Sequence, residues 1–140
     1  MARLASFLMS SLSQNIAVAN GGIVQQLTGP LIVLRPKFIP SEYSFSVTVG
    51  INNIDLTQDN SLRIVFRSPI GSDLVDTGNV TLKATPHDIH LPDEWQGFVA
   101  TLPILNAELV EEGVYQLMVY CNDEHLCTQS IPVYLQGEAK

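Results

Sequence analysis

The amino-acid sequence predicts one all-β domain, folded as an antiparallel sandwich of about eight strands. Apolar and polar residues alternate with a period of two in several short segments, which is typical of strands with one buried and one wet face. Turn residues separate these segments about every ten positions, and no helical pattern of useful length occurs. A chain of 140 residues can bury its own core, so we expect residues 1–140 to form a single domain.

The clearest predicted strand covers Glu42 to Ile51. Its apolar residues occupy every second position, whereas a helix would scatter them around its circumference. In the N-terminal part we expect further strands over residues 3–12, 21–27 and 31–35. The first residues have the outline of a signal peptide, but their serine, glutamine and asparagine side chains make the segment too polar. We therefore expect a first strand in a cytoplasmic protein.

The second half of the chain predicts several short strands and a final hairpin. Strands are expected over residues 62–67, 74–75, 80–84 and 98–104, followed by a hairpin of residues 115–121 and 126–135. Residues 85–94 hold two prolines and several acids, which indicates an exposed connection. Pro132 lacks an amide donor, so its strand lies at an edge or places the proline where no ladder bond is required. Trp95 is expected to fill part of the core.

The charge balance narrows the classes of partner. Hydrophobic residues make up 46% of the chain and charged residues 15%, which is typical of a packed globule. A formal net charge of −7 repels phosphate backbones and anionic membrane surfaces, so we expect neither nucleic acid nor a membrane as partner. The charge is uneven, at +2 for residues 1–70 and −9 for residues 71–140. These acids either solvate loops and edges or form a face that docks a basic partner.

A tyrosine near the C-terminal third indicates the type of sandwich. Glu112-Gly113-Val114-Tyr115 leads into an apolar strand and resembles the tyrosine corner of an immunoglobulin-like sandwich, where the phenol hydroxyl binds a preceding loop. Leu117 stands where antibody domains have the second cysteine of their intersheet disulfide. The resemblance therefore implies the wider immunoglobulin-like class and not an antibody-type domain.

The order of strands and turns also resembles that of an uncharacterised bacterial family of small single-domain proteins. The matching segments are Asn20-Gly21-Gly22-Ile23-Val24, the proline-bearing link Arg35 to Pro40, the strand Tyr43 to Val49, the hairpin Leu62 to Gly71 and the final hairpin Gly113 to Leu135. This chain departs from the family pattern by having Asn122-Asp123-Glu124 in place of a second turn glycine. The resemblance implies the fold and carries no activity.

Cys121 and Cys127 flank the predicted final turn. If the hairpin pairs them directly opposite each other, their β-carbons approach disulfide distance, whereas a shift of one residue leaves two thiols. Without a secretion signal we expect reduced thiols. A zinc site made of Cys121, His125 and Cys127 would need a fourth ligand that the sequence does not place.

A second group of candidate ligands lies in the acidic connection. His87, Asp88, His90 and Asp93 can bind a metal or supply acid–base chemistry, and as loop residues beside prolines they can equally be solvated. No nucleophile with a partnered base is identifiable, and no phosphate-binding glycine loop or hydrolase motif occurs. We therefore expect no catalytic residue, no cofactor and no enzymatic activity.

Two sets of residues are candidates for binding a protein partner. Phe38 and Ile39, between two prolines, either cover the core or form an exposed apolar patch. Glu108, Glu111 and Glu112 belong to the acidic half of the chain. These residues are the reason to expect a docking surface.

The sequence thus leaves the specific function unknown. It predicts a non-catalytic module that binds another protein. It would be an assembly component or an inhibitor of a host protein carried by a phage or mobile element. A sensor of a small ligand or metal is the alternative, and an enzyme is a third class. A homodimer is also expected, through opposite charges on two copies or through an unblocked edge strand.

Overall fold

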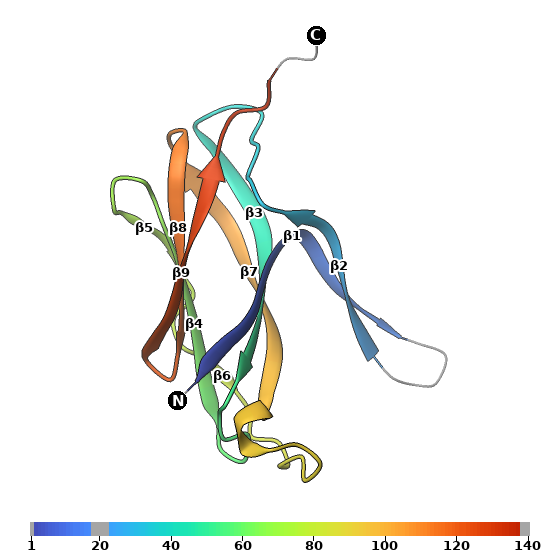
Figure 1. Ribbon diagram of the computed structural model, residues 1–140. Helices are drawn as coiled ribbons and strands as arrows, with labels where there is room; N and C mark the ends of the chain where they lie inside the picture. Colours follow the sequence, from blue (N-terminus) through green and yellow to red (C-terminus); the bar gives the residue numbers. More distant parts are fainter. Residues whose placement is uncertain (1, 18–22, 138–140) are drawn as a thin grey trace.

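The computed structural model describes residues 2–17 and 23–137, which form two antiparallel sheets packed face to face (Figure 1). The first sheet has the strand order β2-β1-β3-β7, and the second has the order β5-β4-β8-β9 with β6 beside β4. The strands are β1 (Arg3–Ala17), β2 (Ile23–Leu31), β3 (Ser41–Asn52), β4 (Asn60–Arg67), β5 (Asp73–Asp76), β6 (Val80–Leu82), β7 (Gly97–Leu109), β8 (Gly113–Cys121) and β9 (Glu124–Val133). The predicted antiparallel sandwich is confirmed, with nine strands in the described part of the chain.

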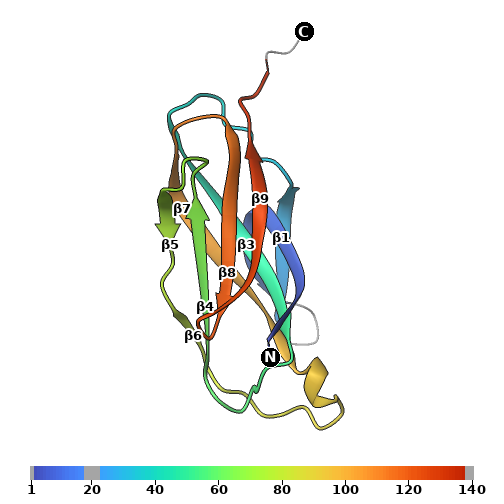
Figure 2. The ribbon, with the colours of Figure 1, turned by 60° about the vertical axis from the view of Figure 1, so that its left-hand side comes forward.

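The core lies between the two sheets; in Figure 2 the strands β4, β8 and β9 of the second sheet lie in front of those of the first. Alternate residues of β3, β4 and β8 point inward and are almost completely buried. Phe45, Phe66 and Tyr115 follow one another across the sandwich, with ring centroids 5.4 Å apart in each neighbouring pair. Such ring pairs contribute about 0.5–1.5 kcal/mol beyond the burial of their area. Each ring comes from a different strand, so the three side chains join the two sheets.

A tyrosine corner stands at the start of β8. The hydroxyl of Tyr115 donates to the backbone carbonyl of Glu111 at 2.7 Å and accepts from the amide of Glu111 at 3.3 Å. The ring is completely buried, so these bonds satisfy its hydroxyl in the core. This is the contact expected from the sequence, and with the two sheets it identifies an immunoglobulin-like sandwich.

Residues 31–35 do not form the separate strand that the sequence predicted. β2 ends at Leu31, and Leu34 makes a single parallel bridge to Val133 of β9. The amide of Leu34 donates to the carbonyl of Pro132 at 3.0 Å. The prediction was wrong because the segment leaves the first sheet here and crosses to the second, so its buried leucine covers the side of the core.

Each long edge strand among the described residues carries a proline. β2, β7 and β9 each pair with one neighbour and contain Pro30, Pro103 and Pro132, respectively. A proline has no amide proton and therefore interrupts pairing with a further strand. The edge position expected for Pro132 is confirmed. The remaining edges of the described sheets are the short strands β5 and β6 and the outer half of β1, residues 11–17, which pairs only with β2 and carries no proline.

β1 and β2 form a hairpin whose outer half stands off the sandwich, at the right of Figure 1. The first part of β1, up to Ser10, pairs with β3, and the rest pairs only with β2. We call residues 11–17 and 23–29 of this hairpin the arm. Gln25 of the arm donates from Nε2 to Oγ1 of Thr101 on β7 at 2.6 Å. The arm therefore lies over the outer face of the first sheet.

Trp95 is not the core residue that the sequence predicted. It ends a short 3-10 helix, η1 (Asp93–Trp95), and half of its surface is exposed. The guanidinium carbon of Arg3 lies 5.0 Å from the centre of its ring, which covers one face of the indole. The prediction was wrong because the connection before β7 runs along the rim of the sandwich. No helix in the described part of the chain has the length and apolar character needed to cross a membrane.

We expect Tyr115→Phe to lower the free energy of unfolding by about 1–2 kcal/mol, because it leaves the partly buried carbonyl of Glu111 without its hydrogen bond. Urea denaturation followed by circular dichroism measures this change. Tyr120→Phe is the matched control, since Tyr120 is half-buried and its hydroxyl contacts the sulfur of Met118 at 3.7 Å. Its expected effect is below about 0.5 kcal/mol. Equal losses in the two variants would show that the corner contact adds nothing.

Candidate functional site

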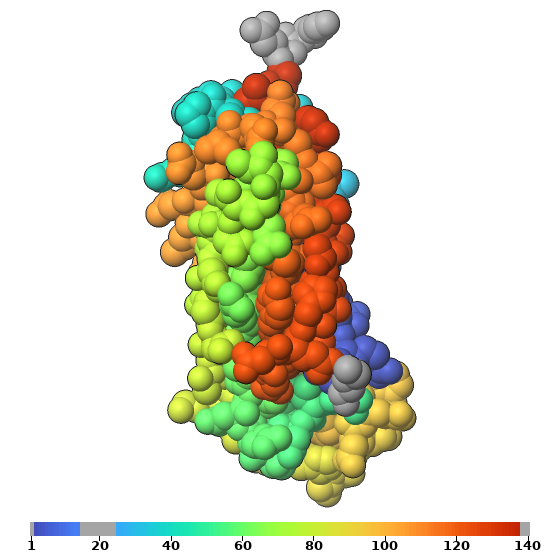
Figure 3. All heavy atoms as spheres, turned by 90° about the vertical axis from the view of Figure 1, so that its left-hand side faces the viewer, coloured from blue at the N-terminus to red at the C-terminus, as the bar shows by residue number. Residues whose placement is uncertain are grey.

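One end of the sandwich brings together the two sets of residues predicted to bind a partner. We call it the tyrosine-corner end, and it consists of residues 34–42, 68–72, 108–115 and 133–136. Glu42 on β3 lies opposite Glu108 on β7, and Gly113 on β8 lies opposite Val133 on β9. At the top of Figure 3, the cyan, orange and red segments of this end meet on one surface.

Hydrogen bonds fix the link before β3 to the segment after β9. The guanidinium of Arg35 donates to the carbonyl of Leu135 at 2.9 Å, and the amide of Gln136 donates to the carbonyl of Pro36 at 3.0 Å. The amide of Leu135 donates to the carboxylate of Glu112 at 3.1 Å. Three segments that are distant in the sequence therefore form one continuous surface.

The predicted glutamates all lie at this end, in different surroundings. Glu108 is exposed on β7, directly opposite the exposed Glu42 of β3. Glu111 is half-buried in the turn before β8, where its backbone binds Tyr115. Glu112 is exposed and accepts the amide of Leu135. The link opposite carries two cations, Arg35 and Lys37, so carboxylates outnumber cations at this end.

Apolar side chains lie among these carboxylates. Phe38 is 66% exposed and Ile39 is half-buried. Of the two alternatives that the sequence left open, core cover or an exposed apolar patch, Phe38 therefore has the exposed one. Sequence reasoning missed Ile70, which is 75% exposed in the turn between β4 and β5. A β-carbon on Gly113 would lie 3.2 Å from Pro69, so this turn packs against the start of β8. Further exposed apolar residues of this end that the sequence did not single out are Val110, Val114, Tyr134 and Leu135.

The four arginines are all engaged within the described chain. Arg63 on β4 forms an ion pair with Asp76 of β5, and Arg67 pairs with Asp73 at 2.7 Å. Arg3 lies over Trp95, and Arg35 binds the backbone of Leu135 as described above. The positive charges on the second sheet are therefore neutralised by acids of the same chain.

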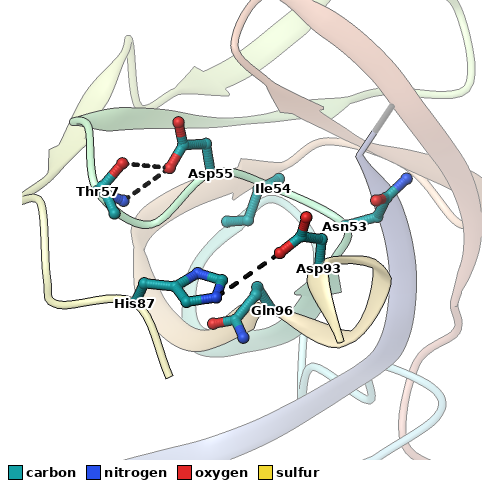
Figure 4. Close-up of a pocket in the computed structure, with 7 residues that line it drawn as sticks. All are labelled: Asn53, Ile54, Asp55, Thr57, His87, Asp93 and Gln96. Carbon is teal, nitrogen blue, oxygen red and sulfur yellow. Dashed lines mark hydrogen bonds and ion pairs between the residues drawn. The ribbon is translucent and has the colours of Figure 1, made fainter. Parts of the chain in front are cut away.

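A pocket of about 490 Å³ opens at the opposite end of the sandwich (Figure 4). It is lined by Asn53, Ile54, Asp55, Thr57, His87, Asp93 and Gln96. His87 Nε2 lies 3.6 Å from Asp93 Oδ1 across the pocket. Gln96 is buried, and its amide donates to the carbonyls of Asp88 and Leu91 at 2.7 and 3.0 Å. These bonds hold the acidic connection over the pocket.

Asp55 and Thr57 in this pocket do not form an activated nucleophile. The hydroxyl and the amide of Thr57 both donate to Oδ1 of Asp55 and lower the pKa of its carboxyl. A carboxylate with a lowered pKa is a weak base near neutral pH. The contact closes a turn, and Asp55 is not a base suited to activating Thr57.

The candidate metal ligands do not gather around one point. His87 and Asp93 line the pocket, whereas the amide of His90 is bound by the Asp88 carboxylate at 2.9 Å and its ring lies outside the lining. No three His, Cys, Asp or Glu side chains among the described residues are placed to hold a metal ion. His125 instead lies within hydrogen-bond distance of Thr128, at 2.8 Å.

The final hairpin separates the two cysteines. Cys121 lies opposite Glu124 and Cys127 lies opposite Val119, and the register shifts by one residue between these two pairs. Both cysteines are free thiols, and burial raises the pKa of each. Of the two registers that the sequence left open, the structure has the one without a cross-strand cysteine pair.

Comparisons with known proteins concern the fold alone. No family model matches the sequence, and no curated protein matches it. A solved structure of an immunoglobulin-like protein from Pseudomonas aeruginosa is similar to this chain, with 14% sequence identity, a TM-score of 0.46, and coverage of 96% of this chain and 97% of that one. The assignment to the immunoglobulin-like class rests on the sheets and the tyrosine corner of this chain.

We expect the carboxyl group of Asp76 to titrate near pH 2. The ion pair with Arg63 is the largest cause, and a hydrogen bond from the amide of Gly78 adds to it, so the pKa falls from 3.8 to about 2. Any stability from this ion pair is present above pH 3.8 and is lost as the pH falls through about 2. Because both side chains are partly exposed, the contribution of this ion pair to the free energy of unfolding is below about 1 kcal/mol.

An NMR titration of the Asp76 side-chain carbon measures this pKa. In Arg63→Gln we expect the pKa to rise toward 3.8, although the Gly78 bond keeps it below that value. Arg67→Gln is the control, since Arg67 pairs with Asp73. An Asp76 pKa that is the same in the Arg63 variant and the parent would contradict the assignment.

Proposed function

We propose that this chain is a non-catalytic β-sandwich module that binds another protein through its tyrosine-corner end. The observation that carries the proposal is the grouping of exposed apolar side chains with carboxylates on one surface. Phe38 and Ile70 supply exposed apolar area, and Glu108, Glu111 and Glu112 lie at the same end of the sandwich. Protein interfaces commonly combine an apolar centre with a polar rim.

The pairing of Glu42 with Glu108 supports a role beyond folding. Two carboxylates directly opposite each other on neighbouring strands repel, which lowers the stability of the sheet. Local choices that oppose stability are expected at functional sites. A partner that brings a lysine or arginine between these two side chains would remove the repulsion on binding.

The charges favour a basic surface on a different protein as the partner. The carboxylates at this end would attract lysine and arginine side chains placed beside an apolar residue. The chain's own Arg63 and Arg67 are neutralised by Asp76 and Asp73, so a second copy offers few cations for head-to-tail pairing. The partner can be a component of a larger assembly or a host protein that the chain inhibits.

A ligand sensor is the second candidate, and the pocket at the opposite end favours it. Its volume of about 490 Å³ fits a small molecule, and Asp55 and Asp93 would attract a cationic group. Binding would raise the melting temperature through linkage. We would measure thermal shifts with a panel of small amines and with divalent cations, using Asp93→Asn as the comparison. No shift with any of these probes would remove this candidate.

We expect a partner captured from a lysate of the native organism to bind the purified chain with a dissociation constant that rises as salt is added. Isothermal titration calorimetry with the purified pair is the measurement. The variant Glu108→Gln, Glu111→Gln, Glu112→Gln should weaken binding about tenfold or more, since it removes the charges that attract the partner. Phe38→Ser should weaken binding similarly by removing the exposed ring.

Matched controls lie at the opposite end of the sandwich. The variant Glu94→Gln, Asp123→Asn, Glu124→Gln removes the same amount of charge, and Ile89→Ser removes an equally exposed apolar side chain. Neither should change the affinity beyond about twofold. If the control variants weaken binding and the tyrosine-corner variants do not, this end is not the docking surface. If neither the tyrosine-corner variants nor the controls change the affinity for the captured partner, that result would also count against the proposal.

A further inference from the structure

The first sheet is almost free of charged residues, although the chain carries a net charge of −7. No Asp, Glu, Lys, Arg or His occurs between Arg3 and Arg35. Within β1, β2, β3 and β7 the charged residues are Arg3, Glu42 and Glu108, all at the margins of the sheet. The outer face of the second sheet differs, since its strands β4 and β5 carry two ion pairs. A solvated outer face of an antiparallel sheet would ordinarily carry charges.

The register arranges the outer face of this sheet in three uncharged rows. The rows across β1, β3 and β7 are Ser6-Gly50-Val99, Leu8-Thr48-Thr101 and Ser10-Ser46-Pro103. Thr48 and Thr101 share a hydrogen bond of 2.7 Å between their hydroxyl oxygens. The middle of these rows is buried, since Ser10, Ser46 and Thr48 are at most 8% exposed, and the exposed part of the rows is uncharged and lies mainly at Leu8, Val99 and Pro103.

The arm makes one wall of a groove above these rows. A cavity of about 490 Å³ lies between the arm and the outer face, lined on the arm side by Leu12 and Gln25 and on the sheet side by Thr101, Pro103 and Leu105. Leu12 is 52% exposed, Leu105 62%, and Val99 in the neighbouring row 67%. Apolar side chains with this exposure on one groove and its rim mark a surface suited to contact with another protein.

A second copy of this chain is the occupant that the charges favour. Two copies repel each other wherever their carboxylates approach, because each carries −7. Apart from Glu42 and Glu108 at its margin, the outer face of the first sheet and the arm form an uncharged surface on which two copies can meet. A two-fold axis would place the same uncharged patch on both copies, as an isologous dimer requires. The prolines of β2, β7 and β9 disfavour edge-to-edge pairing through these three strands.

We infer that two copies of this chain associate through the groove between the arm and the outer face of the first sheet, with Leu12, Val99 and Leu105 in the contact. This surface is separate from the tyrosine-corner end, so the two copies would present two partner-binding ends. The inference does not depend on the proposed function, and variants of the two surfaces test them independently.

Sedimentation equilibrium over a range of protein concentrations, at low and high salt, tests the inference. We expect a monomer–dimer equilibrium in which high salt lowers the dissociation constant, because salt screens the net repulsion and the contact itself contains no ion pairs. Val99→Glu with Leu105→Glu should raise the dissociation constant about tenfold or more, because it places carboxylates in both halves of the contact. The control Ile70→Glu with Ile89→Glu adds the same charge to exposed loop residues and should change the constant much less.

Circular dichroism and urea denaturation show whether each variant is folded, and NMR shifts on dilution supply a second measurement on the unmodified chain. The shifts should concentrate at Leu12, Val99, Thr101 and Leu105. A monomer at every concentration and salt would overturn the inference. A dimer that tolerates Val99→Glu with Leu105→Glu, or one that dissociates in high salt, would also overturn it, since either result assigns the contact to another surface.

Discussion

The arrangement of Phe45, Phe66 and Tyr115 is the contact on which the rest of the structure depends. Phe45 belongs to the first sheet and the other two rings to the second, so their packing joins the two layers. The same tyrosine binds the backbone of Glu111 with its hydroxyl. One side chain therefore fills the core and fixes the turn that carries the acidic residues. The turn at Glu111 is thus held against the core by the hydroxyl of Tyr115.

Charge is distributed between the layers in a way that assigns them different roles. The second sheet carries its arginines and aspartates as ion pairs on β4 and β5, where they serve solubility. In the first sheet the charged residues of the described strands lie at the margins, and the arm covers part of the outer face. The remaining carboxylates concentrate in turns and connections. Carboxylates are therefore concentrated at the ends of the sandwich, and the outer face of the first sheet is mostly uncharged.

The alternation of residues in β3 predicted its two faces because the period of a strand is a local property of the backbone. The tyrosine corner was predictable for the same reason, since its glycine and tyrosine lie within a few residues of the loop that they bind. The glutamates and Phe38 were identified as candidates from exposure and charge alone. Their grouping was not predictable, because it depends on the pairing of β3 with β7 and of β8 with β9.

The sequence by itself determined most of the strands, the acidic character and the absence of charge between Arg3 and Arg35, because these are properties of composition and local spacing. Only the tertiary structure decided where the chain crosses from one sheet to the other, which cysteine faces which residue, and what Trp95 contacts. A bulge in the final hairpin changes the register of Cys127 by one position, and a crossing at Leu34 replaces an expected strand. Such choices depend on the packing of the whole core, since a segment with the same local pattern satisfies its hydrogen bonds equally well in several registers.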